Sequence, residues 1–393
     1  MYKKLLLILL VMILAISSVF AVPFKFVFGD LGQHPEILMG FIPTYILAGA
    51  GYRGIELIED DVTELQALLG FGYNQRKVWQ DKDSGEVKLI DPIVYDVLET
   101  DLILRFVQGF GESTVAGKDL ITLTAGYEGK LEVNLDSMVK GQVRKNNTYS
   151  TISSLNDYLG GENYSGDIYP DLRGNHTMLA NALAFQAKFD IMDDKMTTTD
   201  GFVAKFDAKW APHALNHALS GDADYYSLTL NAVGAKTLFE VESKNGKDLF
   251  TITLVDRANV NWTDGSLVPV FAQGPVSLGR KVRGFNTWTY NTQFTAVNNF
   301  DIRFAGPNLG VKGIFPRANV FFDIGYGCGN YFNTNYSASN FLMSTGVQLT
   351  ISFFDFIDLG YQVAYLFNGN KLSEGDSKIV GSFTFFLDFW LKY

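Results

Sequence analysis

Cysteine is almost absent from this chain, which contains one, Cys328, among 393 residues. A single cysteine cannot form an intramolecular disulfide, so the disulfide-rich class of secreted folds is excluded. The fold must be stabilised in another way, and a closed hydrogen-bonded sheet would suffice.

Clustered positive charge is also missing. The chain has 32 Lys and Arg against 42 Asp and Glu, which gives a formal net charge of −10. A nucleic-acid-binding face needs grouped basic side chains to replace the counterions of the phosphates. Nucleic acid is therefore excluded as a partner.

Long hydrophobic runs are confined to the beginning of the chain. Lys3 and Lys4 precede an apolar run from Leu5 to Ile16, and Val19-Phe20-Ala21 has the form of a cleavage site. This pattern predicts a cleaved secretory signal peptide over residues 1–21 and export of the remainder. A single-pass anchor is the alternative, but it would need about 20 apolar residues.

Beyond residue 21 no segment is long and apolar enough for a membrane helix. If the chain crosses a membrane, it must therefore do so with strands. The aromatic content of 14%, against only 19% charged residues, suits a lipid-facing surface with aromatic girdles.

Apolar and polar residues alternate with a period of two in several segments, which predicts strands with two different faces. The alternation is clear in 65–73, 131–136, 202–210 and 250–254, and clearest in the final strand, 383–393. A soluble β-sandwich also alternates, with its polar face outward, so it remains the alternative to a membrane barrel.

Two connections stand out between these segments. Asn245-Gly246 favours a tight hairpin turn, which we expect on the periplasmic side. The stretch 140–174 lacks periodicity and is predicted to be a long extracellular loop.

Two motifs lie in the last third of the chain. Val282-Arg283-Gly284-Phe285 is followed 40 residues later (323 − 283) by Phe321-Phe322-Asp323-Ile324-Gly325. They resemble the VRGF and FxDxG motifs of the bacterial surface antigen superfamily, which includes the BamA and TamA insertases and the FhaC secretion pore. The resemblance covers roughly 276–393 and extends to the final alternating strand, whose Phe389 and Tyr393 resemble the insertion signal read by the barrel assembly machinery.

This resemblance implies an all-β fold, an outer-membrane antiparallel β-barrel of sixteen strands, with twelve to fourteen as the alternative. It also implies that the VRGF loop folds into the lumen and that Arg283 meets Asp323, with Gly325 leaving room for the loop. The alternation independently places Asp323 on the lumen face. The family usually has Glu where this chain has Asp301.

The resemblance does not extend to the amino-terminal part. No match to a periplasmic POTRA domain is visible, so residues 22–45 are expected to be a short periplasmic segment and 46–393 the barrel. The chain thus resembles a member without POTRA domains, which weakens the expectation of protein insertase activity.

No set of catalytic residues is evident, so the chain is not expected to be an enzyme or to need a cofactor. His213 and His217 have the spacing of a zinc motif, but its Glu is missing. A loop metal site with Asp222 and Asp224 is the alternative to ordinary polar loop residues.

The expected function is outer-membrane biogenesis, insertion of protein or lipid, or lipid homeostasis. The expected partners are outer-membrane lipid, the assembly machinery during insertion, and a protein or lipid client, and a homo-oligomer is left open. A passive diffusion channel constricted by the VRGF loop is one alternative. A surface adhesion barrel using the 140–174 loop is another.

Overall fold

The structure is a computed structural model of the whole chain. It describes residues 25–26, 34–42, 45–55, 57, 61–78, 93–115, 118–135, 142–145, 148–151, 177–193, 200–242, 248–285, 290–307, 314–332, 337–353, 357–368 and 378–387.

Antiparallel strands make up most of the described chain. They are β1 (Lys25–Phe26), β2 (His34–Ile42), β3 (Tyr45–Ile55), β4 (Thr63–Val78), β5 (Ile93–Glu112), β6 (Asp119–Asn134), β7 (Gln142–Lys145), β8 (Thr148–Thr151), β9 (Thr177–Asp190), β10 (Gly201–Ala211), β11 (Asp224–Glu242), β12 (Asp248–Leu267), β13 (Thr292–Ala305), β14 (Ile314–Tyr331), β15 (Ser337–Phe353), β16 (Ile357–Leu366) and β17 (Ile379–Leu387). The short helices are α3 (His213–Ala218), α4 (Val270–Gln273) and α5 (Leu278–Lys281), with a 3-10 turn η2 (Gly274–Val276).

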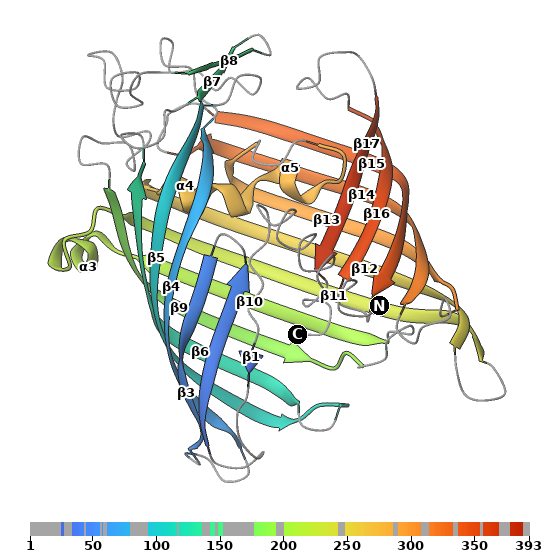
Figure 1. The fold of residues 1–393 in the computed structure, drawn as a ribbon, viewed down its shortest axis with the longest axis horizontal. Helices are drawn as coiled ribbons and strands as arrows, with labels where there is room; N and C mark the ends of the chain where they lie inside the picture. The colour runs from blue at the N-terminus through green and yellow to red at the C-terminus, as the bar shows by residue number, and fades with distance from the viewer. Residues whose placement is uncertain are drawn as a thin grey trace, which may run out of the picture.

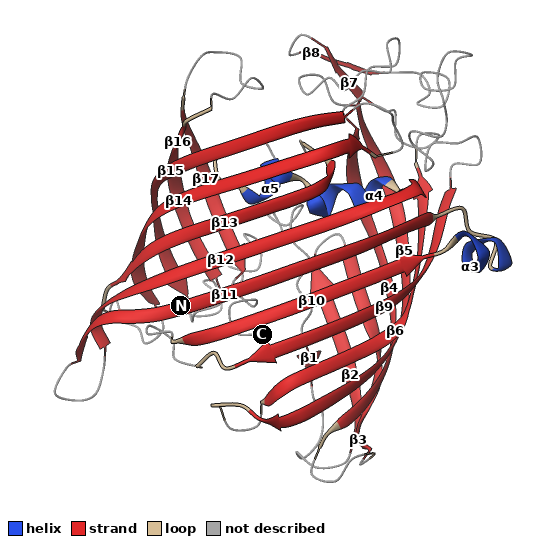
Figure 2. Ribbon diagram, turned by 180° about the vertical axis from the view of Figure 1, so that it is seen from behind, coloured by secondary structure: helices blue, strands red, loops and turns tan. Residues whose placement is uncertain are grey.

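The long strands follow one another in a ladder that curls into a barrel (Figures 1 and 2). Each pairs antiparallel with the next in sequence, from β2 to β6, then β9, and on to β17. The predicted fold class is therefore confirmed. The described ladder includes fourteen strands of nine or more residues, and the expected number of sixteen stays a prediction.

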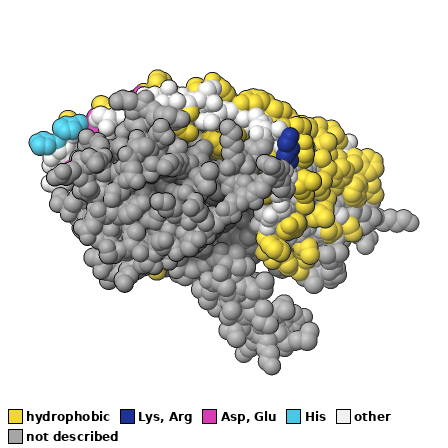
Figure 3. Space-filling model, turned by 90° about the horizontal axis from the view of Figure 1, so that it is seen from above, with side chains coloured by type: hydrophobic (Ala, Val, Ile, Leu, Met, Phe, Trp, Pro, Cys, Tyr) yellow, Lys and Arg dark blue, Asp and Glu magenta, His cyan; other side chains and the backbone are white. Residues whose placement is uncertain are grey.

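The barrel is apolar outside and polar inside. On β14, Val320, Phe322 and Tyr326 are exposed, whereas Arg317 and Asp323 on the alternate positions are buried. Hydrophobic side chains cover the outer wall where Figure 3 shows it. A soluble sandwich would have the opposite arrangement, so the alternation in this sequence belongs to a lipid-facing wall. Other exposed apolar side chains include Leu69, Phe71, Leu104, Phe106, Leu183, Phe185, Phe206, Trp210, Trp262, Leu349, Tyr361 and Val363.

The two ends of the barrel differ in their connections. Because neighbouring strands are antiparallel, the connections alternate between the ends. One end, here the turn end, carries 56–62, 113–118, 191–200, 243–247, 306–313 and 354–356. The other, the loop end, carries the longest ones, 79–92, 135–176, 212–223, 268–291 and 367–378.

Several sequence-based boundaries change. Residues 22–45 were expected to lie before the barrel, but β2 lies within this range and pairs with β3 over its whole length. Its alternation is masked in sequence by consecutive apolar residues such as Ile37-Leu38-Met39, so no strand was recognised. The 140–174 stretch contains the β7–β8 hairpin.

Two further expectations concern the connections and the end of the chain. The strands flanking 243–247 pair as a hairpin. Phe389 and Tyr393 lie outside the described residues. In the described ranges, no helix has the length and hydropathy needed to cross a membrane.

We predict that a charge on the outer wall destabilises the barrel in lipid. Val320→Lys should lower the free energy of unfolding, measured in lipid vesicles, by about 2–4 kcal/mol, because the ammonium group would face hydrocarbon. The control Ser220→Lys, at an exposed turn beyond the strand, should change it by less than about 0.5 kcal/mol. Equal effects of the two substitutions would contradict a lipid-facing wall.

Candidate functional site: a segment anchored inside the barrel

Residues 268–285, in the connection between β12 and β13, fold into the barrel instead of extending away from it. They contain α4, η2 and α5 and are called the internal segment below. Figures 1 and 2 show its helices inside the ring of strands. Pro269 precedes α4 and Pro275 lies in η2, which breaks the segment into short turns because proline cannot continue a helix.

Arg283 fixes one end of the internal segment to β14. Its Nε donates to Asp323 Oδ2 at 2.8 Å and its Nη2 donates to Asp323 Oδ1 at 2.5 Å, which makes a bidentate pair. The backbone N–H of Arg283 also donates to Asp323 Oδ2, at 2.8 Å. Asp323 is fully buried. Both of its carboxylate oxygens accept hydrogen bonds from Arg283.

A second carboxylate extends the pair into a network. Arg283 Nη1 donates to Asp301 Oδ1 on β13 at 2.7 Å, and Arg257 on β12 pairs with the other oxygen of Asp301. The guanidinium carbon of Arg283 also lies 3.9 Å from the ring centre of Phe321. Two guanidinium groups thus balance two buried carboxylates across three strands, which limits the cost of burying them.

Apolar packing supports this polar contact. A buried cluster joins the internal segment to the inner wall of β13–β16, and it consists of Leu278, Val282, Phe285, Tyr290, Val297, Phe321, Leu342, Ala364 and Leu366.

Two glycines allow this approach. A Cβ on Gly325 would lie 2.6 Å from Val282 Cγ2 and 2.7 Å from Leu278 Cδ1. Gly284 has φ of +90° and a Cβ there would lie 2.7 Å from Ala364 Cβ, so both its conformation and its surroundings favour glycine.

The other end of the internal segment contacts a different part of the wall. Val268 and Val276 are buried against inward-facing residues of β9, β10 and β11, with Phe271 and Ala272 partly buried there. The ring of Phe271 lies 5.5 Å from Lys130 Nζ on β6. The segment therefore reaches from β6 and β9 to β14 across the lumen.

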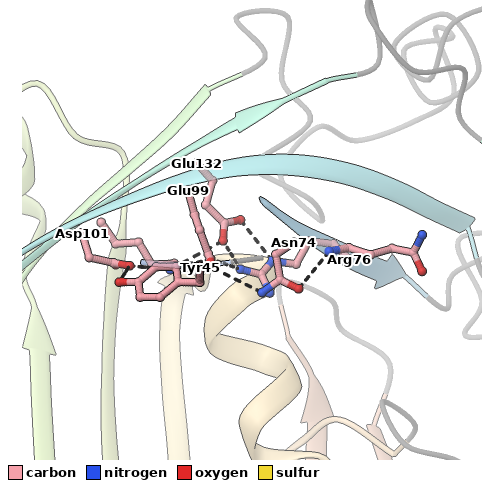
Figure 4. Close-up of polar contacts among 8 residues, drawn as sticks. Tyr45, Asn74, Arg76, Glu99, Asp101 and Glu132 are labelled. Carbon is pink, nitrogen blue, oxygen red and sulfur yellow. Dashed lines mark hydrogen bonds and ion pairs between the residues drawn. The ribbon is translucent and has the colours of Figure 1, made fainter. Parts of the chain in front are cut away.

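Lys130 belongs to a network of charged residues on the inner wall of β3–β6. Figure 4 shows other members of this network, Tyr45, Arg76, Glu99, Asp101 and Glu132. Its Nζ lies 2.8 Å from Glu99 Oε2 and 3.2 Å from Asp101 Oδ1. Arg76 Nη2 lies 2.9 Å from the same Glu99 oxygen and also pairs with Glu132.

Tyr45 on β3 completes this wall by donating its hydroxyl to Asp101 Oδ2 at 2.6 Å. The network therefore ties four neighbouring strands together. The network contains three carboxylates and two cations. The negative charge of its carboxylates therefore holds Lys130 in place beneath Phe271.

The cations of the internal segment have different electrostatic surroundings. Burial lowers the pKa of Arg283, but the hydrogen bond to Asp323 and the charge of Asp301 outweigh it and raise the pKa, so this group stays charged. Burial and the charge of Arg280 lower the pKa of Lys281 to about 8. Lys281 Nζ donates to Asn259 on β12.

The structure brings most of the motif residues together. Val282, Arg283, Gly284 and Phe285 lie against the wall that carries Phe321, Asp323 and Gly325. That these residues act as a latch, which holds the internal segment in the lumen, stays a prediction. Sequence reasoning missed Arg257, although its inward position follows from the alternation of β12.

The network on β3–β6 was also missed. Its charged residues occupy the inward positions of strands whose alternation is visible in the sequence. Only their pairing could not be read, because it depends on the register between strands.

His213 and His217 lie on α3, with ring centres 5.8 Å apart. Asp224 instead accepts from the backbone N–H of His213 and from Ser266 Oγ. Among the described residues, no group of three or more His, Cys, Asp or Glu is placed to hold a metal ion.

Comparison with known proteins gives structural likeness at low sequence identity. No protein-family model matches the chain, and no curated protein matches it. BamA from Haemophilus ducreyi lacking POTRA domains 1-3 is similar over 90% of this chain, with 12% identity and a TM-score of 0.46. The barrel is similar to that of BamA.

Two further solved structures, CdiB from Escherichia coli and CdiB from Acinetobacter baumannii, are each similar over 90% of this chain. Their identities are 9% and 12% and their TM-scores 0.43 and 0.42. The chain spans 63%, 59% and 56% of the three structures, in the order given. The likeness concerns the fold alone.

We predict that Arg283→Ala releases the internal segment while the barrel stays folded. The substitution removes the guanidinium group that pairs with the buried carboxylates of Asp323 and Asp301. The free energy of local opening should therefore fall by about 3 kcal/mol. Trypsin cleavage after Arg280 and Lys281 should then be about 100-fold faster in folded protein.

The control for this prediction is Arg105→Ala. It removes a lumen ion pair with Glu128 that does not involve the internal segment, and it should leave cleavage unchanged. Equal cleavage of wild type and Arg283→Ala would show that the latch does not hold the segment.

We also predict that Gly325→Ala displaces the internal segment by steric conflict. The added methyl group would overlap Val282 and Leu278, at a cost of about 1–3 kcal/mol. Backbone hydrogen exchange over 278–285 should accelerate by about 10-fold or more. Gly234→Ala is the matched control, because a Cβ there would meet only Phe202 Cδ2 at 3.9 Å, and it should leave exchange as in wild type.

Proposed function

We propose that the chain is an outer-membrane β-barrel of the bacterial surface antigen type that serves outer-membrane biogenesis by helping protein or lipid enter the membrane. The observation that supports this most is the internal segment, which carries the VRGF residues and is held by Arg283 against Asp323 and Asp301. A barrel with an anchored segment across its lumen suits a role at the membrane better than free diffusion of solutes.

The wall of the barrel supports the location. Its exposed apolar side chains alternate with buried polar ones, as a lipid-spanning barrel requires. Short periplasmic turns and longer outer loops are typical of such barrels, so the loop end is assigned to the cell exterior. The internal segment then enters the lumen from outside.

The ends of the ladder suggest where the activity would reside. Among the long strands, the described pairings of β2 and β17 are with β3 and β16, their neighbours in sequence. We take the junction between the first and the last long strands as the place where the wall would open. Lipid and the membrane-inserted part of a client are the partners that this proposal requires.

A passive channel is the second candidate function, because the inner wall is rich in polar groups. The two candidates differ in what Arg283 does. In a channel the internal segment is a constriction, so Arg283→Ala should raise ion conductance strongly. In the biogenesis proposal the wild-type barrel should conduct poorly and act on other molecules.

The test measures both properties on one preparation. The refolded protein is placed in lipid vesicles, an unfolded outer-membrane barrel is added, and its folding rate is compared with that in empty vesicles. We expect at least a 10-fold acceleration by wild type and little steady conductance in planar bilayers. A large wild-type conductance with no acceleration would favour the channel, and heat-denatured protein in the same vesicles is the control.

A further inference from the structure

The outer wall of β11–β13 carries two aromatic belts. Near the loop end, Tyr226 and Trp262 pack edge to face with ring centres 5.4 Å apart. Near the turn end, Phe250 lies 6.4 Å from Phe239 and 6.5 Å from Phe304. Aromatic girdles of this kind mark the two membrane interfaces of a barrel.

The spacing of the belts fits one membrane crossing. On β12, Phe250 and Trp262 face outward and are 12 residues apart (262 − 250). A rise of about 3.3 Å per residue and a tilt of about 40° convert this separation into a depth of about 30 Å. The apolar band of known barrels is about 25 Å tall.

Asp256 lies midway between these belts and faces outward. It is six residues from Phe250 (256 − 250) and six from Trp262 (262 − 256), on the same exposed face of β12. Its side chain is not part of the internal network, because the next residue, Arg257, faces the lumen and pairs with Asp301. A carboxylate at this depth would face hydrocarbon, which is unfavourable and therefore points to a function.

One polar neighbour shares this position. Asn298 on β13 donates from its Nδ2 to Asp256 Oδ1 at 2.7 Å, and this contact is exposed. The hydrogen bond uses one carboxylate oxygen. Within the described part of the chain, Asp256 Oδ2 and the side-chain oxygen of Asn298 then remain as acceptors on the outer wall.

Small residues flank the carboxylate on its β11 side, whereas on its β13 side Asp256 pairs directly with the exposed Phe300. Gly234 on β11 pairs directly with Asp256, and Ala232 pairs with Ala258 in the next row. A Cβ at Gly234 would meet only Phe202 Cδ2, at 3.9 Å. Small residues let another backbone approach closely within a membrane. A second polypeptide could therefore reach the acceptor oxygens of Asp256 and Asn298 from the β11 side.

We propose that Asp256 and Asn298 form a docking site for a membrane-embedded polypeptide segment that carries arginine at the depth of the bilayer centre. The guanidinium group supplies several donors in a plane and a charge opposite to that of Asp256. A second copy fits less well, because a two-fold axis through this patch would bring the two Asp256 carboxylates together. This inference rests on the membrane location in the proposed function, but not on the biogenesis role.

The test uses a synthetic transmembrane helix of leucine and alanine with arginine at its centre as the probe. The full chain carries Cys328→Ser and a dye at Ser220→Cys, and energy transfer to a dye on the helix is measured in phosphatidylcholine vesicles. The same helix with central leucine is the comparison. We expect the arginine helix to bind wild type at least 10-fold more tightly than the leucine helix, and Asp256→Asn to remove the difference.

The control variant is Asp264→Asn, which changes an aspartate on β12 that lies beyond Trp262 towards the loop end. It should bind both helices as wild type does. Heat-modifiable gel mobility checks that each variant is folded and inserted, so failure of the membrane location is recognised separately.

Two results would overturn the proposal. One is equal binding of the two helices by inserted wild type, or arginine binding that Asp256→Asn leaves unchanged. The other is energy transfer between differently labelled barrels that is lost in Asp256→Asn, which would identify a second copy as the occupant.

Discussion

The constraint on which the rest of the structure depends is the need to pair every backbone N–H and C=O group within an apolar environment. An antiparallel sheet curled into a barrel satisfies these groups between strands. Its side chains then alternate between a wall that meets lipid and a lumen that does not. In this chain the alternation places Val320 and Phe322 outside and Asp323 inside, so one sequence pattern separates the membrane surface from the functional interior.

A polar lumen makes the internal segment possible. Residues 268–285 carry backbone groups and basic side chains that could not lie among apolar residues alone. The Arg283 side chain donates hydrogen bonds to Asp323 and Asp301. Several backbone N–H groups of the segment donate to carbonyl groups of the segment itself. The short helices α4 and α5 pack their apolar residues on two different parts of the wall, so the segment acts as a strut across the lumen.

The two ends of this strut use different chemistry. At β14 the contact is a bidentate ion pair, which is directional and depends on both partners. At β6 the ring of Phe271 lies 5.5 Å from Lys130 Nζ, which is a cation–π contact. The end at β14 is therefore the end whose position is fixed by directional hydrogen bonds.

The sequence by itself determined the fold class, the face of each clear strand and the motif residues at 282–285 and 321–325. These follow from local periodicity and from a short resemblance, and both are properties of neighbouring residues. The strand at His34–Ile42 was not predicted from the sequence, because an uninterrupted apolar stretch has no visible period. Only the tertiary structure decided that Arg283 also binds Asp301, that Arg76, Glu99 and Glu132 meet, and that Asp256 lies beside Gly234 midway between two aromatic belts. Each of these contacts depends on the register between strands, and register is fixed by the whole closed sheet and not by any one segment.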